Sequence, residues 1–258
     1  MTHPLQGRKV VVTRPAGQEQ DLMLALEQAG AKPLAFPTLA IEPREPEVAD
    51  RQKILDLDRY YAVICVSANA ARFGLDMLAD FWPQWPVQQL WFAVGPATGE
   101  AMSDWGLNIN VAQQGSTSET LLDHPALQNV SGQQILILRG EGGRETLADR
   151  LRERGAQVDY LELYRRVKPA THPRPLLALL DQPECPILTV TSGDGLRNLM
   201  AMAGNRLNRL QQCPLLVVSG RLAEFARQQG FVTVWQAASP SATDVIAALN
   251  RALHPALH

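Results

Sequence analysis

An internal repeat constrains the fold of this chain more than any single motif does. A shift of 125 positions places Arg14 on Arg139 and the pair Gly30-Ala31 on Gly155-Ala156. At a shift one position smaller, WFAVGPATGEAM lies over LLVVSGRLAEFA, and at two positions smaller STSETLL lies over SPSATDV. Chance matches would not keep nearly one spacing along a whole chain, so we predict two copies of one structural unit.

Each copy alternates short apolar segments with amphipathic ones. A helix is predicted at 18–28, because its apolar residues recur on one face. Gly30 is expected to end this helix, as Gly155 ends its partner at 145–154. The predicted strands of the first copy are 9–13, 33–36, 62–67, 90–94 and 108–112. Apolar, β-branched strands separated by single helices predict the α/β class, with a doubly wound (flavodoxin-like) parallel sheet in each copy.

The stretch RGEGG, residues 139–143, resembles an anion-binding turn. It follows an apolar run and precedes a helical pattern, and the N–H groups of such a glycine-rich turn can hold an anion. No Gly-Lys-Ser/Thr follows, which excludes a P-loop, and Glu145 replaces the third glycine of the dinucleotide fingerprint. The local sequence leaves open which anion, if any, this turn holds.

The ends of the other predicted strands carry similar residues. The eight strand-end turns are TRPAGQ, VSANA, VGPATG, GSTSE, LRGEGG, TSGDG, VSGRL and SPSAT. Ligands of doubly wound sheets bind beyond these carboxyl ends of the strands. Ordinary helix N-capping favours the same residue types and is the simpler interpretation of any single turn. Together the turns predict a cleft rich in neutral hydrogen-bond donors, suited to a large ligand with many acidic groups.

The charge balance and the Cys and His residues exclude several classes of protein. The formal net charge is −2 and the isoelectric point is 6.2, so we expect no contact with nucleic acid. Twenty of the 24 basic residues are Arg, which suits recognition of carboxylates, although codon usage is the simpler explanation of most of them. Three Cys without a CxxC motif indicate reduced thiols, and five His without ligand spacing predict that there is no metal site.

The N-terminal segment MTHPLQGRKVVVTRP contains no apolar stretch of the signal-peptide kind. No apolar run in the chain reaches membrane-spanning length. We therefore expect a cytoplasmic protein without membrane contact.

Six longer segments follow one another in an order that matches a known family. They are VVTRPAGQ, YAVICVSANAARF, WFAVGPATGEAM, STSETLL, LILRGEGGRETLADRLRERGAQVDYLELYRR and VVSGRLAEFARQQGF. Through them the chain resembles the uroporphyrinogen-III synthase family over essentially its full length. The stretch RGEGGR followed by YRR is the most distinctive part. The chain departs from the family pattern at TSGDG and VSGRLAE, which leaves Leu222 out of the predicted site.

The resemblance implies two doubly wound lobes joined by a two-stranded β-ladder. One lobe combines residues 1–38 with 169–258, the other spans 42–164, and the linkers are 37–43 and 162–169. The repeat supports this division, because PTLAIEP and ELYRRVKP, the two linkers, coincide at the same offset and both end at proline. Each copy is then expected to donate its first β-α-β unit to the other's sheet.

The resemblance also implies a cyclising hydro-lyase of tetrapyrrole (haem) biosynthesis. The family's substrate is hydroxymethylbilane, a linear tetrapyrrole with carboxylate side chains on every ring, and the product is uroporphyrinogen III. Water is lost and ring D is inverted. The bilane closes by itself to the uninverted isomer, so catalysis must select a geometry through positioning and charge placement. We expect no cofactor, no partner besides the small-molecule substrate, and a monomer.

Tyr164 is the predicted catalytic residue. Its counterpart in the repeat is Leu39, and its phenol is expected to face either the core or the cleft. The resemblance favours the cleft, because a tyrosine here is the family's usual candidate for assisting departure of the hydroxyl group. The predicted substrate-binding residues are Arg14, Ser67, Asn69, Gly95, Thr98, Arg139, Gly140, Ser192, Gly193, Ser219 and Gly220.

The two arginines among these residues have an equal alternative. Arg14 and Arg139 occupy matching turns, and each either pairs with a substrate carboxylate or forms an intramolecular ion pair that holds its turn. Arg144 and Glu145, in the first turn of the following helix, are expected to be surface or capping groups.

Two other functions fit the same fold. A cytoplasmic, non-catalytic two-lobed binder of a polyanionic small molecule would have the same donor-rich cleft. A nucleotide-sugar transferase would need a longer chain and an acidic ribose-binding residue, which we do not find in the sequence. The isomer formed from hydroxymethylbilane distinguishes these functions from the synthase.

Overall fold

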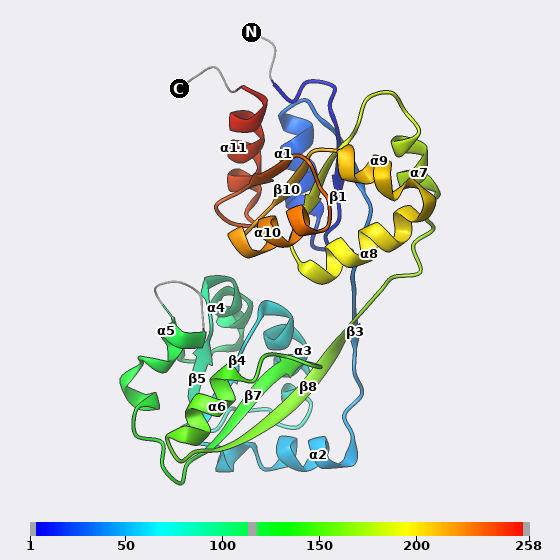
Figure 1. The fold of residues 1–258 in the computed structure, drawn as a ribbon. Coiled ribbons are helices and arrows are strands. Elements are labelled where there is room, and N and C mark those ends of the chain that lie inside the picture. The colour runs from blue at the N-terminus through cyan, green and yellow to red at the C-terminus, as the bar shows by residue number, and fades with distance from the viewer. Residues whose placement is uncertain (1–3, 113–117, 255–258) are drawn as a thin grey trace. The chain divides into compact units, whose positions relative to one another are not determined.

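The computed structural model describes residues 4–112 and 118–254, which fall into two compact units (Figure 1). Unit 1 comprises Met1–Ala40 and Val167–His258, and unit 2 comprises Ile41–Arg166. The predicted strand-end turn GSTSE, residues 115–119, lies mostly outside the described residues.

Unit 1 is built on a five-stranded sheet with the strand order β11-β10-β9-β1-β2, in which all neighbours are parallel. Read from β2, the strands follow the chain order 2-1-3-4-5, which is typical of flavodoxin-like sheets. The elements are β1 (Lys9–Val12), α1 (Gln20–Gln28), β2 (Lys32–Ala35), α7 (Arg174–Leu180), β9 (Ile187–Val190), α8 (Gly193–Ala203), a 3₁₀ turn (Gly204–Arg206), α9 (Leu207–Gln212), β10 (Leu215–Val217), α10 (Gly220–Gln228), β11 (Val234–Gln236) and α11 (Ala242–Leu253).

Each face of this sheet has its own apolar core. On one face Val11 of β1 packs with residues of α7, α8, α9 and α10. On the other face Val10 and Val12 pack with residues of α1 and α11. Because both faces are covered, a strand such as β10 is buried and apolar at every position, as expected for a parallel sheet.

Unit 2 contains a six-stranded sheet with the order β3-β8-β7-β4-β5-β6, in which the strands from β8 to β6 are parallel. The elements are β3 (Ala40–Pro43), α2 (Val48–Leu55), β4 (Ala62–Cys65), α3 (Ala68–Ala79), β5 (Leu90–Ala93), α4 (Pro96–Met102), β6 (Ile109–Val111), α5 (Ser118–Leu122), β7 (Gln134–Gly140), α6 (Thr146–Glu153) and β8 (Gln157–Val167), with 3₁₀ turns at Leu57–Arg59, Ser103–Trp105 and Pro125–Leu127.

The sheet of unit 2 is also covered on both faces. Val63 and Cys65 of β4 belong to a core with α2, α3 and α4. The alternate residues Ala62 and Ile64 belong to a second core with α5 and α6. The alternation follows from the two-residue period of a strand, which sends successive side chains to opposite faces.

The predicted α/β class with parallel sheets is confirmed, and β1, β2, β4, β5 and β6 match the predicted strands within two residues at each end. The strand predicted at 62–67 ends early because Ser67 is the N-cap of α3, where its Oγ accepts a hydrogen bond from Ala70 N–H. The predicted helices begin one or two residues late, at Gln20 and Thr146.

The two glycines predicted to end helices do so. Gly30 follows α1 with a φ of 83°, and Gly155 follows α6 with a φ of 85°. This left-handed conformation costs a glycine little and other residues more, because glycine has no Cβ.

The pairing of β8 with β7 contains a β-bulge that positions Tyr164. Arg139 lies opposite Glu162, whereas the next residue, Gly140, lies opposite Tyr164. The strand therefore carries one extra residue, and side chains after it are turned to the other face. As a result Leu163 and Tyr164, although adjacent, both reach the core beside α3.

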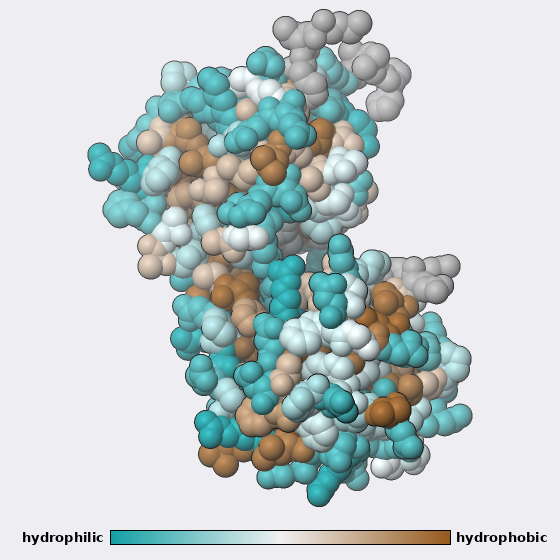
Figure 2. All heavy atoms as spheres, turned by 180° about the vertical axis from the view of Figure 1, so that it is seen from behind, coloured by the Kyte–Doolittle hydropathy of each residue, from teal (hydrophilic) through white to brown (hydrophobic). Residues whose placement is uncertain are grey.

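Apolar surface is dispersed on the face of the molecule that Figure 2 shows. The brown patches there are small and bordered by hydrophilic residues. The exposed large apolar residues are Leu24, Val48, Leu55, Phe81, Val87, Val111 and Val232. Within the described residues, no helix has both the length and the apolar character needed to cross a membrane.

Candidate functional site

Tyr164 lies at the centre of a polar cluster in unit 2. Its side chain is 1% exposed, and its Oη is 3.0 Å from Ser67 Oγ. Arg166 Nη2 donates a hydrogen bond of 3.3 Å to the same Oη. The ring packs against Gly140, where a Cβ would lie only 2.5 Å from ring atom Cε2. Three predicted site residues, Ser67, Gly140 and Tyr164, are thus brought together, and Gly140 is the last residue of β7 rather than part of the turn.

The β-bulge explains why these groups meet. Without the extra residue, strict alternation would place Tyr164 on the face that carries Tyr160 and Glu162. With it, the ring lies 5.8 Å from that of Phe73 on α3, at the end of the sheet where Ser67 begins the helix. The side chains of Tyr164 and Arg166 lie on one face, because they are two residues apart on the strand.

Ser67 holds its Oγ in a fixed place. As the N-cap of α3 it accepts the Ala70 N–H at 3.1 Å, and its own hydroxyl hydrogen stays available. The contact with Tyr164 permits either oxygen to be the donor. The N-capping interpretation and a role at the site are therefore compatible for this residue, since one uses a lone pair and the other uses a proton.

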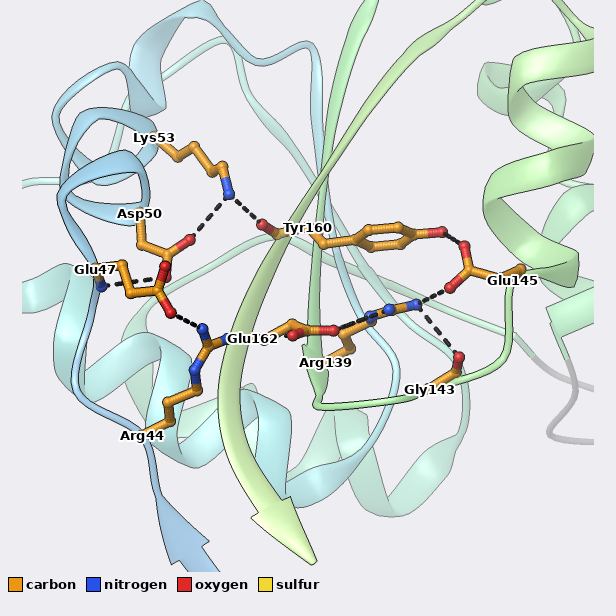
Figure 3. A network of polar contacts seen from close by, with 9 residues as sticks. All are labelled: Arg44, Glu47, Asp50, Lys53, Arg139, Gly143, Glu145, Tyr160 and Glu162. Carbon is orange, nitrogen blue, oxygen red and sulfur yellow. Dashed lines mark hydrogen bonds and ion pairs between the residues drawn. The ribbon is translucent and has the colours of Figure 1, made fainter.

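Arg139 is buried in a network of its own unit (Figure 3). Its Nε and Nη2 donate to Glu162 Oε1 at 3.1 and 2.9 Å, and its Nη1 donates to Glu145 Oε1 at 2.7 Å. The Gly143 carbonyl accepts a weaker bond of 3.4 Å. The guanidinium carbon lies 3.7 Å from the centroid of the Tyr160 ring, whose hydroxyl bonds Glu145 Oε2. The intramolecular ion pair is thus present at Arg139.

The electrostatics of this network favour the charged forms. Burial by itself lowers the pKa of Arg139, but hydrogen bonds and charge from Glu145 and Glu162 together raise it. The pKa of Glu145 is lowered, first by the hydrogen bond from Tyr160 and then by that from Arg139. Glu145 is exposed, in agreement with the expected surface position, and although it stands at the N-cap of α6 it makes no capping hydrogen bond.

The network continues to β3 and α2. Arg44 Nη1 lies 3.1 Å from Glu162 Oε2, and Arg44 Nη2 also bonds Glu47. Lys53 Nζ bridges Asp50 Oδ1 at 2.9 Å and the Tyr160 carbonyl at 2.8 Å. Glu162 therefore receives a cation on each side of β8, and the binding role predicted for Arg139 would require a substrate to compete with two carboxylates.

Arg14, the matching residue in unit 1, has a different environment. Its Nη1 donates to the Gln18 carbonyl at 3.5 Å, and its Nη2 donates to the Pro240 carbonyl. Its Nε is buried without a hydrogen-bond partner, and burial lowers its pKa while Asp21 partly opposes this. Within the described parts of the chain, no carboxylate forms an ion pair with Arg14, so the side chain has unused donors for an anion.

Three of the other site residues predicted in unit 1 line one pocket of about 600 Å³. Ser192, Gly193 and Ser219 line it, together with Arg197 and Arg221. Both serines are N-caps whose Oγ accept backbone N–H groups, at 3.0 Å from Gly195 and 3.3 Å from Leu222. Gly220 follows as the first residue of α10. Leu222, left out of the prediction, also lines the pocket.

Asn69, Gly95 and Thr98 lie in strand-end turns of unit 2. Gly95 is the N-cap of α4, and its carbonyl accepts the N–H of Thr98 at 3.0 Å. Thr98 is 5% exposed, and Asn69 lies in the first turn of α3. Helix capping accounts for the described hydrogen bond between Gly95 and Thr98.

The prediction did not include three arginines that the structure places at these sites, namely Arg166, Arg197 and Arg221. The spacing of two between Tyr164 and Arg166 was the available signal for the first. The other two follow the strand-end serines Ser192 and Ser219 by five and two residues, which is a signal shared by many surface arginines.

The described residues contain no group of three or more His, Cys, Asp or Glu side chains that could hold a metal ion. His3 and His258 lie outside the described residues. Cys65 is fully buried, and burial raises the pKa of its thiol to about 12, so the thiolate that binds metals is disfavoured there.

The fold and these sites define a parallel α/β protein of two units, with serine, glycine and arginine groups at the carboxyl ends of its strands. Comparison with known proteins identifies the family. The family model described as "Uroporphyrinogen-III synthase HemD" matches residues 20–247. The chain therefore belongs to the uroporphyrinogen-III synthase family, as its sequence motifs predict.

Individual relatives agree with this assignment. The uroporphyrinogen-III synthase of Escherichia coli K12 is 34% identical over 228 residues, which cover 86% of this chain and 92% of that protein. That of Synechococcus elongatus is 29% identical over 206 residues, covering 79% of this chain and 78% of that protein. The solved structure of a mutant uroporphyrinogen III synthase from Thermus thermophilus has a TM-score of 0.62 at 19% identity, covering 96% of this chain and 100% of that one, and so supports the fold.

Proposed function

We propose that this protein closes hydroxymethylbilane to uroporphyrinogen III, with loss of water and inversion of ring D. The observation that carries the proposal is membership of the uroporphyrinogen-III synthase family over residues 20–247. The uncatalysed bilane closes to the uninverted isomer, so the protein has to hold one geometry of a reactive intermediate rather than make a difficult bond.

Tyr164 is the residue that assists departure of the terminal hydroxyl group. The hydroxyl leaves as water and takes its second hydrogen from the pyrrole N–H of the same ring, which leaves an azafulvene. Tyr164 then has to supply only a hydrogen bond to the departing oxygen. Attack by the substituted carbon of ring D on this electrophile gives a spiro intermediate, which fragments and recloses with the ring inverted.

The hydrogen bonds around Tyr164 support this role. Its Oη has two lone pairs, and Ser67 and Arg166 are placed to donate to both of them. In that arrangement neither neighbour uses the phenolic hydrogen, so it can donate to a ligand that reaches the hydroxyl. Incoming hydrogen bonds also polarise the O–H group, which strengthens it as a donor.

The predicted substrate-binding residues at the strand ends bind the carboxylates and the ring N–H groups of the substrate. In unit 2 these are Ser67, Asn69, Gly95, Thr98, Arg139 and Gly140, and in unit 1 they are Arg14, Ser192, Gly193, Ser219 and Gly220. The unused donors of Arg14 and the two arginines beside the serines of the unit 1 pocket support carboxylate binding in unit 1. For Arg139 to bind a substrate carboxylate, that carboxylate has to replace Glu145 or Glu162.

The chain arose by duplication, with domains of residues 1–38 plus 169–258 and 42–164 and linkers 37–43 and 162–169 that pair as a two-stranded ladder. The strand orders support this history, since β11-β10-β9-β1-β2 repeats β6-β5-β4-β7-β8 with the first two strands of each copy exchanged. The Arg44 N–H bonds the Leu163 carbonyl at 2.8 Å, which supports pairing of the linkers.

The protein works in the cytoplasm as a monomer without a cofactor. The reaction loses water and changes no oxidation state, so it needs neither a redox group nor a second substrate. The small apolar patches in Figure 2 are typical of a monomer surface. The free state of Cys65, Cys185 and Cys213 suits a reducing compartment.

The test is the isomer formed from hydroxymethylbilane. The bilane is mixed with the protein, the products are oxidised to porphyrins, and isomers I and III are separated by chromatography. We expect isomer III with the native protein and isomer I with heat-denatured protein. Isomer I alone, formed at the rate of the buffer, would overturn the proposal, and tight binding of the bilane without closure would identify a non-catalytic binder.

A further inference from the structure

We infer that Arg166 binds a carboxylate of the substrate beside Tyr164 and, by doing so, uncovers the Tyr164 hydroxyl. The inference rests on the proposed function and adds to it a specific anion-binding residue. Arg139, one of the two arginines predicted either to bind a substrate carboxylate or to form an ion pair, already has two carboxylate partners.

Arg166 is the arginine of this site with donors to spare. It is exposed, and its contacts are with Tyr164, whose Oη it bonds and whose ring centroid lies 5.6 Å from its guanidinium carbon. Its neighbour Arg165 is paired with Glu42 at 2.9 Å. In the part of the chain that the structure describes, no carboxylate forms an ion pair with Arg166.

The shape of the side chain fits a carboxylate. A guanidinium carries five N–H donors in a planar fork, and one of those of Arg166 is used by Tyr164. A second edge of the fork is sufficient for two parallel hydrogen bonds to one carboxylate, an arrangement that an ammonium group does not reproduce. A substrate with carboxylates on every pyrrole ring offers such a group close to any reacting carbon.

Binding there would change the access to Tyr164. The phenol is 1% exposed, and its Oη is covered by Ser67 on one side and Arg166 on the other. Ser67 is fixed by its cap on α3, whereas Arg166 is exposed and only loosely held at 3.3 Å. A carboxylate competes with a neutral phenol for the guanidinium, because charge-assisted hydrogen bonds are the stronger ones. Arg166 is therefore the contact that gives way.

The first test measures steady-state kinetics with hydroxymethylbilane for Arg166→Met and Arg166→Lys, with Arg165→Met as the matched control. Loss of a charge-assisted contact predicts a KM about tenfold higher, or more, for Arg166→Met. Arg166→Lys should recover part of this, because the charge remains and the fork is lost. Arg165→Met should keep the native KM, since its partner Glu42 is exposed.

The second test does not use activity. Tetranitromethane nitrates accessible tyrosines, and mass spectrometry separates the rate at Tyr164 from that at Tyr60, Tyr61 and Tyr160. Arg166→Met should nitrate faster at Tyr164 only. Circular dichroism confirms folding, and Arg166→Gln replaces Arg166→Met if the latter unfolds.

The outcomes separate the two proposals. A native protein that yields no isomer III refutes the proposed function, whereas nitration still reports whether Arg166 covers Tyr164. A native protein that yields isomer III while Arg166→Met keeps the native KM refutes the carboxylate role. An unchanged nitration rate at Tyr164 in the folded variant refutes the covering role.

Discussion

Arg14, two residues after the end of β1, and Arg139, near the end of β7, occupy positions that match at the shift of 125 residues, but they have opposite environments. Arg139 is held between Glu145 and Glu162, which raise its pKa, whereas Arg14 donates to two backbone carbonyls and its pKa is lowered by burial. Of these two matching positions, one therefore holds a structural ion pair and the other leaves donors unused.

The sequence contains the reason for this difference. At the shift of 125 positions, Glu145 falls on Gln20 and Glu162 falls on Pro37. The first half of the chain thus lacks, at the matching positions, both carboxylates that neutralise Arg139. Partners on another element decide the role of an arginine, and a comparison of single turns does not reveal them.

The largest effect is expected when the paired arginine is removed. Arg139→Met leaves Glu162 partly buried without this cation, and we expect it to lower the free energy of unfolding by about 3 kcal/mol. Arg14→Met, the matched control, removes an unpaired polar atom and should cost about 1 kcal/mol or less. Urea unfolding of both variants measures the difference, and equal costs would contradict the contrast between the turns.

The next effect concerns Tyr164, whose counterpart at the shift of 125 positions is Leu39. Tyr164→Phe should slow closure to uroporphyrinogen III by about 10²-fold, the lower end for positioned proton donors, because the electron-rich pyrrole expels its hydroxyl readily. Its stability cost should be about 1 kcal/mol, for one hydrogen bond to Ser67. Tyr160→Phe, on the same strand, is the control and should keep the rate. Full activity and stereochemistry in Tyr164→Phe would make Tyr164 a packing residue.

A substitution at Gly140 tests whether the close packing of the Tyr164 ring against this glycine is needed. In Gly140→Ala the new Cβ would lie 2.5 Å from the Tyr164 ring and 3.0 Å from its Oη. We expect a loss of about 2 kcal/mol of unfolding free energy, as for other overpacked sites, together with reduced activity. In a Tyr164→Leu background the stability loss should shrink. If it does not, the backbone and not the ring requires glycine here.

A smaller, pH-dependent effect is expected from Glu145. Its pKa lies below the ordinary value when folded, through Tyr160 and then Arg139, so its stabilisation is complete above that value and is lost as the pH falls through the lower one. Because Glu145 is half exposed, the effect should stay below about 1 kcal/mol. Unfolding from about pH 6 to about pH 3 should therefore show a smaller loss in Glu145→Gln than in the native protein. Parallel curves would contradict this.

The smallest effect is expected from a substitution that makes the surroundings of Arg14 similar to those of Arg139. Gln20→Glu places a carboxylate at the position that matches Glu145, and an ion pair with Arg14 should add about 0.5 kcal/mol. The gain should disappear in an Arg14→Met background, which a double-mutant cycle measures. A gain that persists there would come from the helix N-terminus and not from Arg14.

Most of the fold could be predicted from local sequence. The strands at β1, β2, β4, β5 and β6 and the helix-ending glycines Gly30 and Gly155 follow from periodicity and from backbone conformations that glycine alone adopts readily. The first residues of the helices could not be predicted to the exact position, since Glu145 has a helical backbone conformation yet lies outside α6.

The site was predicted in part. Ser67, Gly140 and Tyr164 do meet, and so do Ser192, Gly193 and Ser219, because the carboxyl ends of parallel strands share one edge of a sheet. The internal partners of Arg139 could not be assigned, because one of them, Glu162, is brought opposite by strand pairing over 23 residues.

The sequence by itself determined the alternation of strands and helices and the family, and it predicted the repeat, because these depend on residue order and spacing alone. Only the tertiary structure decided which way Tyr164 faces and which arginine is left with spare donors. A bulge of one residue in β8 reverses the face of every side chain after it, and no local period records such a shift. Tyr164 therefore meets Ser67 and Arg166, while Arg139 is kept by Glu145 and Glu162.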